Sequence, residues 1–239
     1  MKLLLSVCLL SIALAIANGT AAFAQSSGSA SSYADQTMQR GISVDLAATS
    51  GAEPMPAADD QEAWIVTVAD DGSLYLGTQP VSQETLRSWM ISHPRRRDQK
   101  LYIKADAHTS YANVEKALDA CHKAAFSAAV LLTSQETRSE TGSRVPPEGL
   151  EVLITEIINS DPKPTVVYIL NGAGDSPGLR INKQNVPWDY LQSTVDGIFG
   201  NRSRRMAVVK ADEGVPFAHV VHVIDTCRSA GAKVALVAP

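Results

Sequence analysis

The sequence lacks the features that would assign it to several specialised classes of protein. It has no excess of positive charge, because 21 Lys and Arg residues face 25 Asp and Glu residues, so a broad nucleic-acid-binding surface is not expected. It has no long apolar run beyond its first residues, and with 45% hydrophobic and 19% charged residues it is neither a multi-span membrane protein nor wholly disordered. A length of 239 residues fits one large domain or two small ones.

The one strongly apolar segment stands at the N-terminus. Lys2 precedes the apolar residues 3–17, and Ala22-Phe23-Ala24 places small residues before Gln25. This order is typical of a cleaved secretory signal, so residues 1–24 are predicted to be a signal peptide. The alternative is an uncleaved membrane anchor, but the apolar run is shorter than the roughly 20 residues that a bilayer requires.

The rest of the chain repeats itself. Lys104-Ala105-Asp106 recurs 106 residues later as Lys210-Ala211-Asp212. At this or nearly this offset the matching pairs are Leu74/Leu179, Val81/Val186, Leu86/Leu191, Tyr111/Phe217, Val114/Val220, Asp119/Asp225 and Cys121/Cys227. So many matches predict a tandem duplication. The predicted segments are a flexible leader at 25–40, a first copy at 41–134, a linker at 135–148 and a second copy at 149–239.

Each copy is predicted to contain the elements β-β-β-α-β-α-β. The first strands are expected at 42–46 and 150–154 because their sequences resemble each other. In the first copy, Asp70-Asp71-Gly72 predicts a hairpin turn, and Ser82 is a candidate N-cap of the first helix. Gly231 suits the end of the last helix. The predicted fold class is α/β (α+β), with a small mixed sheet covered by two helices in each copy.

Two stretches resemble the periplasmic domain of the ExbD/TolR family. Residues 210–237, KADEGVPFAHVVHVIDTCRSAGAKVALV, resemble a family ending of the type ADxxVPY…VVxVMDxxRxAGxxKVxLVT. Residues 71–77 followed by Gln79-Pro80-Val81 resemble the preceding family motif DGxIYLNGxPV. The first copy departs from the ending, with His108-Thr109-Ser110 where the second has Gly214-Val215-Pro216.

The resemblance implies a non-enzymatic periplasmic component or modulator of a proton-driven biopolymer transport or envelope-integrity complex. Its implied partners are motor-complex membrane proteins, outer-membrane receptors and peptidoglycan. Family domains pair, so two fused copies are expected to form a pseudo-dimer within one chain, with a homo-oligomer as the alternative. The remaining alternatives are a membrane-anchored transporter component and a secreted enzyme.

The motor chemistry of the family is not expected here. The resemblance implies a proton-handling aspartate in a membrane helix, but residues 3–17 contain no Asp or Glu and no cytoplasmic tail precedes them. An intramembrane proton relay needs an ionisable side chain. The protein is therefore expected to share only the periplasmic domain with the family, and to contain two copies of it.

No catalytic, cofactor-binding or metal-ligating residue is predicted, and no cofactor. A nucleophile–base constellation is not expected in this chain. His219, His222 and Asp225 have a spacing that can place metal ligands on one helix face. The first copy has Asn113 and Lys116 at the histidine positions, so a solvated helix face is favoured.

Other polar and cysteine pairs are predicted to be structural. Asp106 and Asp212 are expected to make local hydrogen bonds at strand ends, and Asp119 and Asp225 to be solvated or structural helix residues. The basic loops at Arg95, Arg96, Arg97, Arg202, Arg204 and Arg205 are expected to be soluble turns, with contact to anionic envelope material as the alternative. Cys121 and Cys227 are expected to lie in two separate cores, too far apart for a disulfide.

Overall fold

The computed structural model describes residues 41–96, 99–135, 147–155, 163–172, 176–200, 202–203 and 205–238. The predicted signal peptide at 1–24, the leader at 25–40, most of the linker and the residues Arg97 and Arg204 lie outside these residues. Among the described residues, no helix combines the length and the apolar character needed to cross a membrane.

The described elements form two halves. The first half contains β1 (Ala48–Thr49), β2 (Glu53–Pro54), η1 (Pro56–Asp59), β3 (Trp64–Val68), β4 (Leu74–Leu76), β5 (Gln79–Val81), α1 (Gln83–Ser92), β6 (Leu101–Ala105), α2 (Tyr111–Lys123) and β7 (Ala128–Gln135). The second contains β8 (Glu148–Thr155), β9 (Thr165–Leu170), β10 (Gly178–Ile181), β11 (Gln184–Asn185), η2 (Trp188–Tyr190), α3 (Leu191–Gly200), β12 (Met206–Ala211), α4 (Phe217–Ser229) and β13 (Lys233–Val237). The predicted α+β class is confirmed.

Local sequence explains where several elements begin and end. The Ser82 side chain accepts the backbone N–H of Thr85 at 3.1 Å and so caps α1, as predicted. Gly72 has a φ of +83° in the turn between β3 and β4, and Gly231 has a φ of +78° after α4. Both lie in the left-handed region, which glycine enters without the steric penalty of a Cβ atom.

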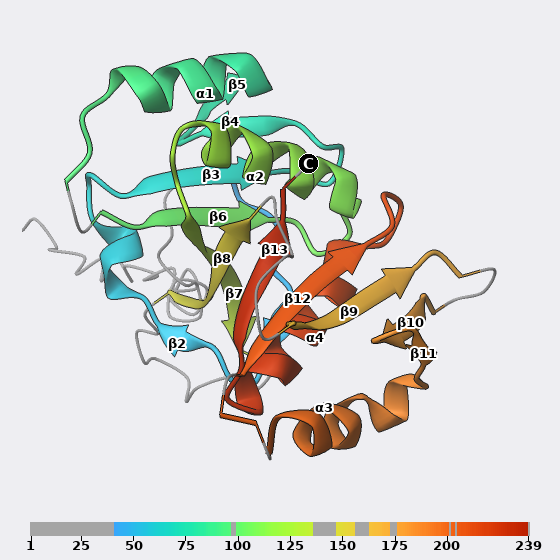
Figure 1. The fold of residues 1–239 in the computed structure, drawn as a ribbon. Coiled ribbons are helices and arrows are strands. Elements are labelled where there is room, and N and C mark those ends of the chain that lie inside the picture. The colour runs from blue at the N-terminus through green and yellow to red at the C-terminus, as the bar shows by residue number, and fades with distance from the viewer. Residues whose placement is uncertain are drawn as a thin grey trace, which may run out of the picture.

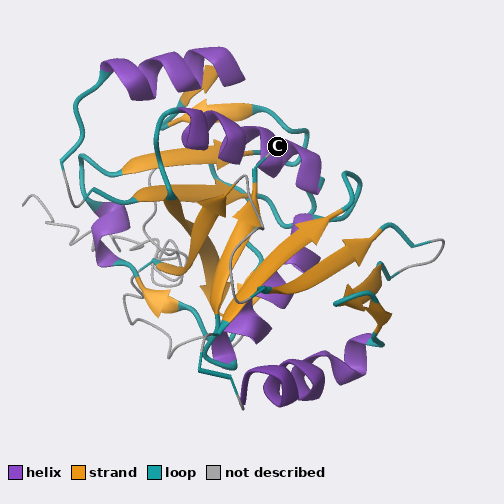
Figure 2. Cartoon of the chain, in the orientation of Figure 1, coloured by secondary structure: helices purple, strands orange, loops and turns teal. Residues whose placement is uncertain are grey.

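The two halves share one strand order. The order β5-β4-β3-β6-β7 in the first half recurs as β11-β10-β9-β12-β13 in the second. In both halves three strands form an antiparallel meander, and the first strand of the meander also pairs in parallel with the next strand along the chain, which pairs in parallel with the last. The two sets belong to one continuous sheet, because β8 pairs in parallel with β13 and antiparallel with β7. Figure 1 shows β8 between them, and Figure 2 shows α1 and α3 at opposite ends of the molecule.

The apolar core runs through both halves. Buried side chains from α2, such as Leu118 and Cys121, belong to the same contact cluster as Ile224 and Cys227 of α4. The expectation of two separate cores is therefore wrong, since β8 joins the two strand sets and α2 contacts both β8 and α4. A smaller cluster covers the opposite face of the first half, with Met55, Ala58, Ile65, Tyr102, Val130 and Leu132.

The predicted first strand of the first copy is also wrong. Residues 42–46 form only an isolated antiparallel bridge, between Leu46 and Asp106, and the short strand β1 begins at Ala48. The corresponding residues 150–154 lie inside β8, as predicted. The difference follows from pairing: β8 has a neighbouring strand on each side, whereas β1 pairs only with the last residues of β7.

Candidate functional site

The two halves interlock where α2 and α4 begin. The backbone N–H of Tyr111 donates to the carbonyl oxygen of Val215 at 2.8 Å, and the N–H of Phe217 donates to the carbonyl oxygen of Thr109 at 2.9 Å. Each donor and each acceptor has its counterpart 106 residues away. Such reciprocity is the property of an interface with two-fold symmetry.

A second reciprocal pair of hydrogen bonds extends this interlock. Ala112 donates to Glu213 at 3.1 Å, and Ala218 donates to Ala107 at 2.9 Å. All four donors lie in the first turn of a helix, where backbone N–H groups have no acceptor within the helix itself. Each half therefore supplies the acceptors that the helix start of the other half needs.

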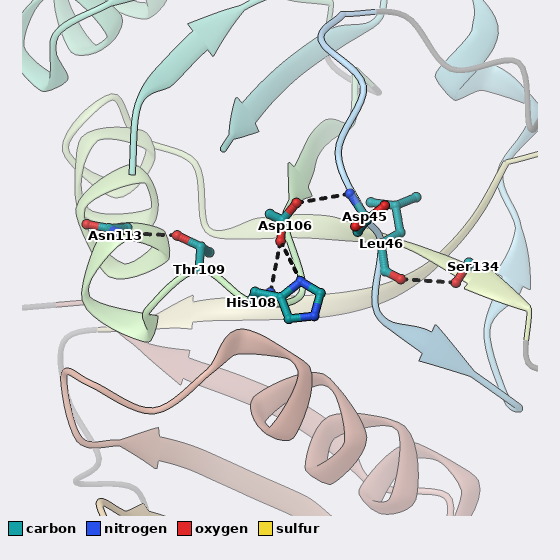
Figure 3. A network of polar contacts seen from close by, with 7 residues as sticks. All are labelled: Asp45, Leu46, Asp106, His108, Thr109, Asn113 and Ser134. Atoms are coloured by element: carbon teal, nitrogen blue, oxygen red, sulfur yellow. Dashed lines mark hydrogen bonds and ion pairs between the residues drawn. The ribbon is translucent and has the colours of Figure 1, made fainter. Parts of the chain in front are cut away.

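Asp106 lies directly before the interlocking residues of the first half, and its carboxylate binds the backbone on either side (Figure 3). Its carboxylate accepts the backbone N–H of Asp45 at 3.0 Å and that of His108 at 2.9 Å. Burial opposes ionisation of Asp106, but these N–H bonds and the His108 side chain hold its pKa below the usual value. The predicted strand-end hydrogen bonding is observed.

Asp212 plays the matching part in the second half with different partners. Its carboxylate accepts the Tyr168 hydroxyl at 2.6 Å and the backbone N–H of Asn171 at 2.8 Å. The lysines beside the two aspartates differ: Lys104 is buried, and desolvation lowers its pKa, whereas Lys210 is half-buried. The repeated Lys-Ala-Asp segment thus lies at the same strand end in both halves, but its charged side chains have different neighbours in each half.

The helix aspartates are buried structural residues rather than solvated ones. Asp225 accepts the backbone N–H of Ser50 at 2.9 Å and that of Gly51 at 3.1 Å, so the first half is fastened to α4 of the second. Asp119 accepts hydrogen bonds from Gln83 and Lys123, both at 2.8 Å. The sequence could not reveal the Asp225 contact, because Ser50 and Gly51 lie about 175 residues upstream in a segment without periodicity.

The structure does not assemble the helix-face group of His219, His222 and Asp225. The centroids of the His219 and His222 rings lie 5.4 and 6.0 Å from that of the Trp188 ring. The Asp225 carboxylate instead accepts the backbone N–H of Ser50. Desolvation and the neighbouring His222 lower the pKa of His219. The described residues instead bring Asp45, Asp106 and His108 together, with potential ligand atoms within 4.8 Å of one another.

The described arginines of the two basic loops are held by their own half. Arg95 donates to the carbonyl oxygen of Ala125 at 2.8 Å and lies 4.3 Å from the centroid of the Phe126 ring. Arg202 donates to the Thr165 hydroxyl at 2.9 Å. These contacts fit the predicted soluble turns, in which guanidinium groups such as that of Arg96 remain accessible.

Two open hollows border the first basic loop and share Arg96 and Gln99 in their walls. One has a volume of about 420 Å³ and the other about 830 Å³. The second is lined by apolar groups that include Trp64, Trp89 and Val81. Among the lining residues that the structure describes, neither hollow contains a Cys, His or Asp side chain.

The comparison with protein families supports the resemblance seen in the sequence. Residues 32–136 match the family model described as biopolymer transport protein ExbD/TolR. The match spans the predicted first copy. No curated protein and no solved structure matches the chain.

Proposed function

We propose that the protein is a non-enzymatic periplasmic component of a proton-motive-force-driven transport or envelope-integrity complex, and that it acts by contact with proteins or the cell wall. The match of residues 32–136 to the ExbD/TolR family supports the transport role. The N-terminal sequence supports export with cleavage after Ala24. Two tandem copies are supported by the shared strand order of the halves.

The reciprocal hydrogen bonds between residues 107–112 and 213–218 carry the proposal. Family domains of this kind are implied to pair, and a two-fold pair presents the same patch of both subunits to each other. Here both patches belong to one chain, and the shared strand β8 fixes them beside each other. The protein therefore offers its partners a preassembled pair without needing a second copy.

The mode of contact is proposed to use side-chain surfaces rather than addition of a partner strand. The outer strands of the main sheet are β5 and β11, with 3 and 2 residues respectively. Pro80 in β5 has no N–H to donate to a partner strand. Short edges that contain proline are poor templates for strand addition.

A gene deletion with complementation tests the function. We expect the deletion to reduce uptake across the outer membrane that is sensitive to a protonophore, or to release periplasmic proteins, and wild-type protein to restore the phenotype. Normal uptake together with an intact envelope would count against the proposal. N-terminal sequencing of the protein from cell envelopes separates cleavage after Ala24 from the alternative of a retained anchor.

Sedimentation of the purified mature protein tests the intramolecular pair separately. A compact monomer is expected at low and high protein concentration, since the pairing surface is already occupied within the chain. An elongated particle with independent lobes would contradict the pair without bearing on the transport role.

A further inference from the structure

A mixed nitrogen and oxygen donor set occurs in the first half, at the end of β6. Asp45 comes from the segment before β1, whereas Asp106 and His108 come from the loop between β6 and α2 (Figure 3). Their potential ligand atoms lie within 4.8 Å of one another. We propose that these three side chains bind one Zn²⁺ ion.

The spacing of two donors already suits a tetrahedral ion. The Nδ1 atom of His108 lies 3.2 Å from Oδ1 of Asp106. Bonds of about 2.0–2.1 Å at a tetrahedral centre place neighbouring ligand atoms about 3.3–3.4 Å apart. Zn²⁺ can thus enter between these two atoms in place of the direct contact between them, with little movement of either side chain.

The Asp106 carboxylate is oriented before any ion arrives. Each of its oxygens accepts one backbone N–H, from Asp45 or from His108, and each retains a further lone pair for a ligand bond. Hydrogen bonds of this kind fix the direction of a metal-binding carboxylate. At 7% exposure, the side chain has little freedom to swing away.

The backbone holds the two contributing segments together. The N–H of Ala107 donates to the carbonyl oxygen of Asp45 at 2.7 Å, and that of Asp106 donates to Val68 at 2.9 Å. The Ser134 hydroxyl donates to the carbonyl oxygen of Leu46 at 3.2 Å. The ion would therefore join two segments that backbone hydrogen bonds already hold beside each other.

The second half provides an internal comparison. Asp212 occupies the equivalent strand end, yet Gly214 stands where the first half has His108. The Asp212 carboxylate binds Tyr168 and Asn171 instead. The strand-end turn thus forms without an imidazole, so the fold alone does not explain His108, whose side chain is 73% exposed.

The donor types favour Zn²⁺ over the common hard cations. One imidazole and two carboxylates match the ligands of Zn²⁺ sites, whereas Ca²⁺ and Mg²⁺ take about six or more oxygen ligands. The exposed Asp45 and His108 leave a fourth position accessible to water or to a group from a partner. Because the imidazole must be neutral to bind the ion, Zn²⁺ affinity falls on acidification.

Calorimetry on the purified, EDTA-treated protein tests the site with ZnCl₂ and MgCl₂ near neutral pH. We expect one Zn²⁺ per chain, and a dissociation constant raised about tenfold or more by His108→Ala and by Asp45→Asn. Asp45→Asn retains the backbone N–H that Asp106 accepts, and both side chains are exposed, so the fold should persist. Zn²⁺ should also raise the melting temperature of the wild type more than that of either variant.

Two control variants separate this site from His93 and from the histidine pair beside Trp188. His93→Ala removes an exposed imidazole at the end of α1, and a His219→Ala, His222→Ala double variant removes the pair beside Trp188. Both should bind Zn²⁺ as the wild type does. The proposal is overturned if the wild type does not bind Zn²⁺, if His108→Ala binds it equally well, or if only the double variant loses it.

Discussion

Tyr111 in the first half donates its backbone N–H to the carbonyl oxygen of Val215 in the second half at 2.8 Å. The reciprocal bond runs from Phe217 to Thr109 at 2.9 Å. In a dimer, symmetry would generate the second bond from the first. Here two distinct stretches of one chain form both bonds, and each stretch begins a helix that packs into the shared core. The start of each helix therefore depends on the presence of the other half.

Proline substitution can remove the other two bonds of this interlock while keeping the helices. Ala112 and Ala218 are the second residues of α2 and α4, and proline is tolerated in a first helical turn. We expect the Ala112→Pro, Ala218→Pro double variant to lose about 1–3 kcal/mol of unfolding free energy in urea titrations, since two inter-half bonds are lost. Glu84→Pro, at the second position of α1, is the control for each substitution made singly and should lose less than Ala112→Pro or Ala218→Pro alone. Equal losses would show that the interlock adds nothing.

The sequence predicted the elements better than their assembly. The spacing of Tyr111, Val114, Leu118 and Cys121 predicts one apolar helix face, and all four side chains are buried on α2. That prediction needed only local periodicity and the repeat. The central position of β8 was not predicted, because pairing between strands that are distant in sequence leaves no periodic trace in either strand. The Asp106 contact with Asp45 was missed for the same reason, although the spacing of Asp106 and His108 was visible.

The contact between Asp225 and residues 50–51 should contribute to the stability of the whole chain. Asp225→Ala removes a buried acceptor for two backbone N–H groups and the Ser50 hydroxyl, so we expect a loss of about 2–3 kcal/mol in unfolding free energy. Ser50→Ala removes only the hydroxyl bond, and about 0.5–1.5 kcal/mol should be lost. Urea unfolding measures both values. A loss in Asp225→Ala no larger than that in Ser50→Ala would contradict the role of the backbone bonds.

Cys121 and Cys227 should resist chemical modification in the native protein. Both thiols are free and buried, and desolvation raises the pKa of Cys121 and of Cys227 to about 12. Near neutral pH almost no thiolate forms, and the thiolate is the reactive species. Mass spectrometry after iodoacetamide treatment should show no labelling of Cys121 and Cys227 in buffer and labelling of both in urea. A Cys121–Cys227 disulfide in non-reducing peptide mapping would contradict this arrangement.

Glu115 should make stability depend on pH through its place between the halves. Burial, followed by the charges of Glu213 and Asp119, raises the pKa of Glu115 above its usual 4.5, while Lys210 opposes the shift. A raised pKa means that the folded protein retains a proton that the unfolded chain has already released. Stability therefore falls as pH rises from the unfolded to the folded pKa, and the penalty remains at higher pH.

Replacing the Glu115 carboxylate by an amide should remove this penalty. Because the side chain is only half-buried and solvent screens its charge, we expect Glu115→Gln to raise the unfolding free energy at neutral pH by about 0.2–0.5 kcal/mol. Below the pKa in both states the carboxyl group is neutral in folded and unfolded protein alike, so wild type and variant should converge there. Urea unfolding over a pH series measures the difference. In a Glu213→Gln background the gain in unfolding free energy should be smaller, since one repelling charge is already absent. Destabilisation by Glu115→Gln at neutral pH would contradict a raised pKa of Glu115.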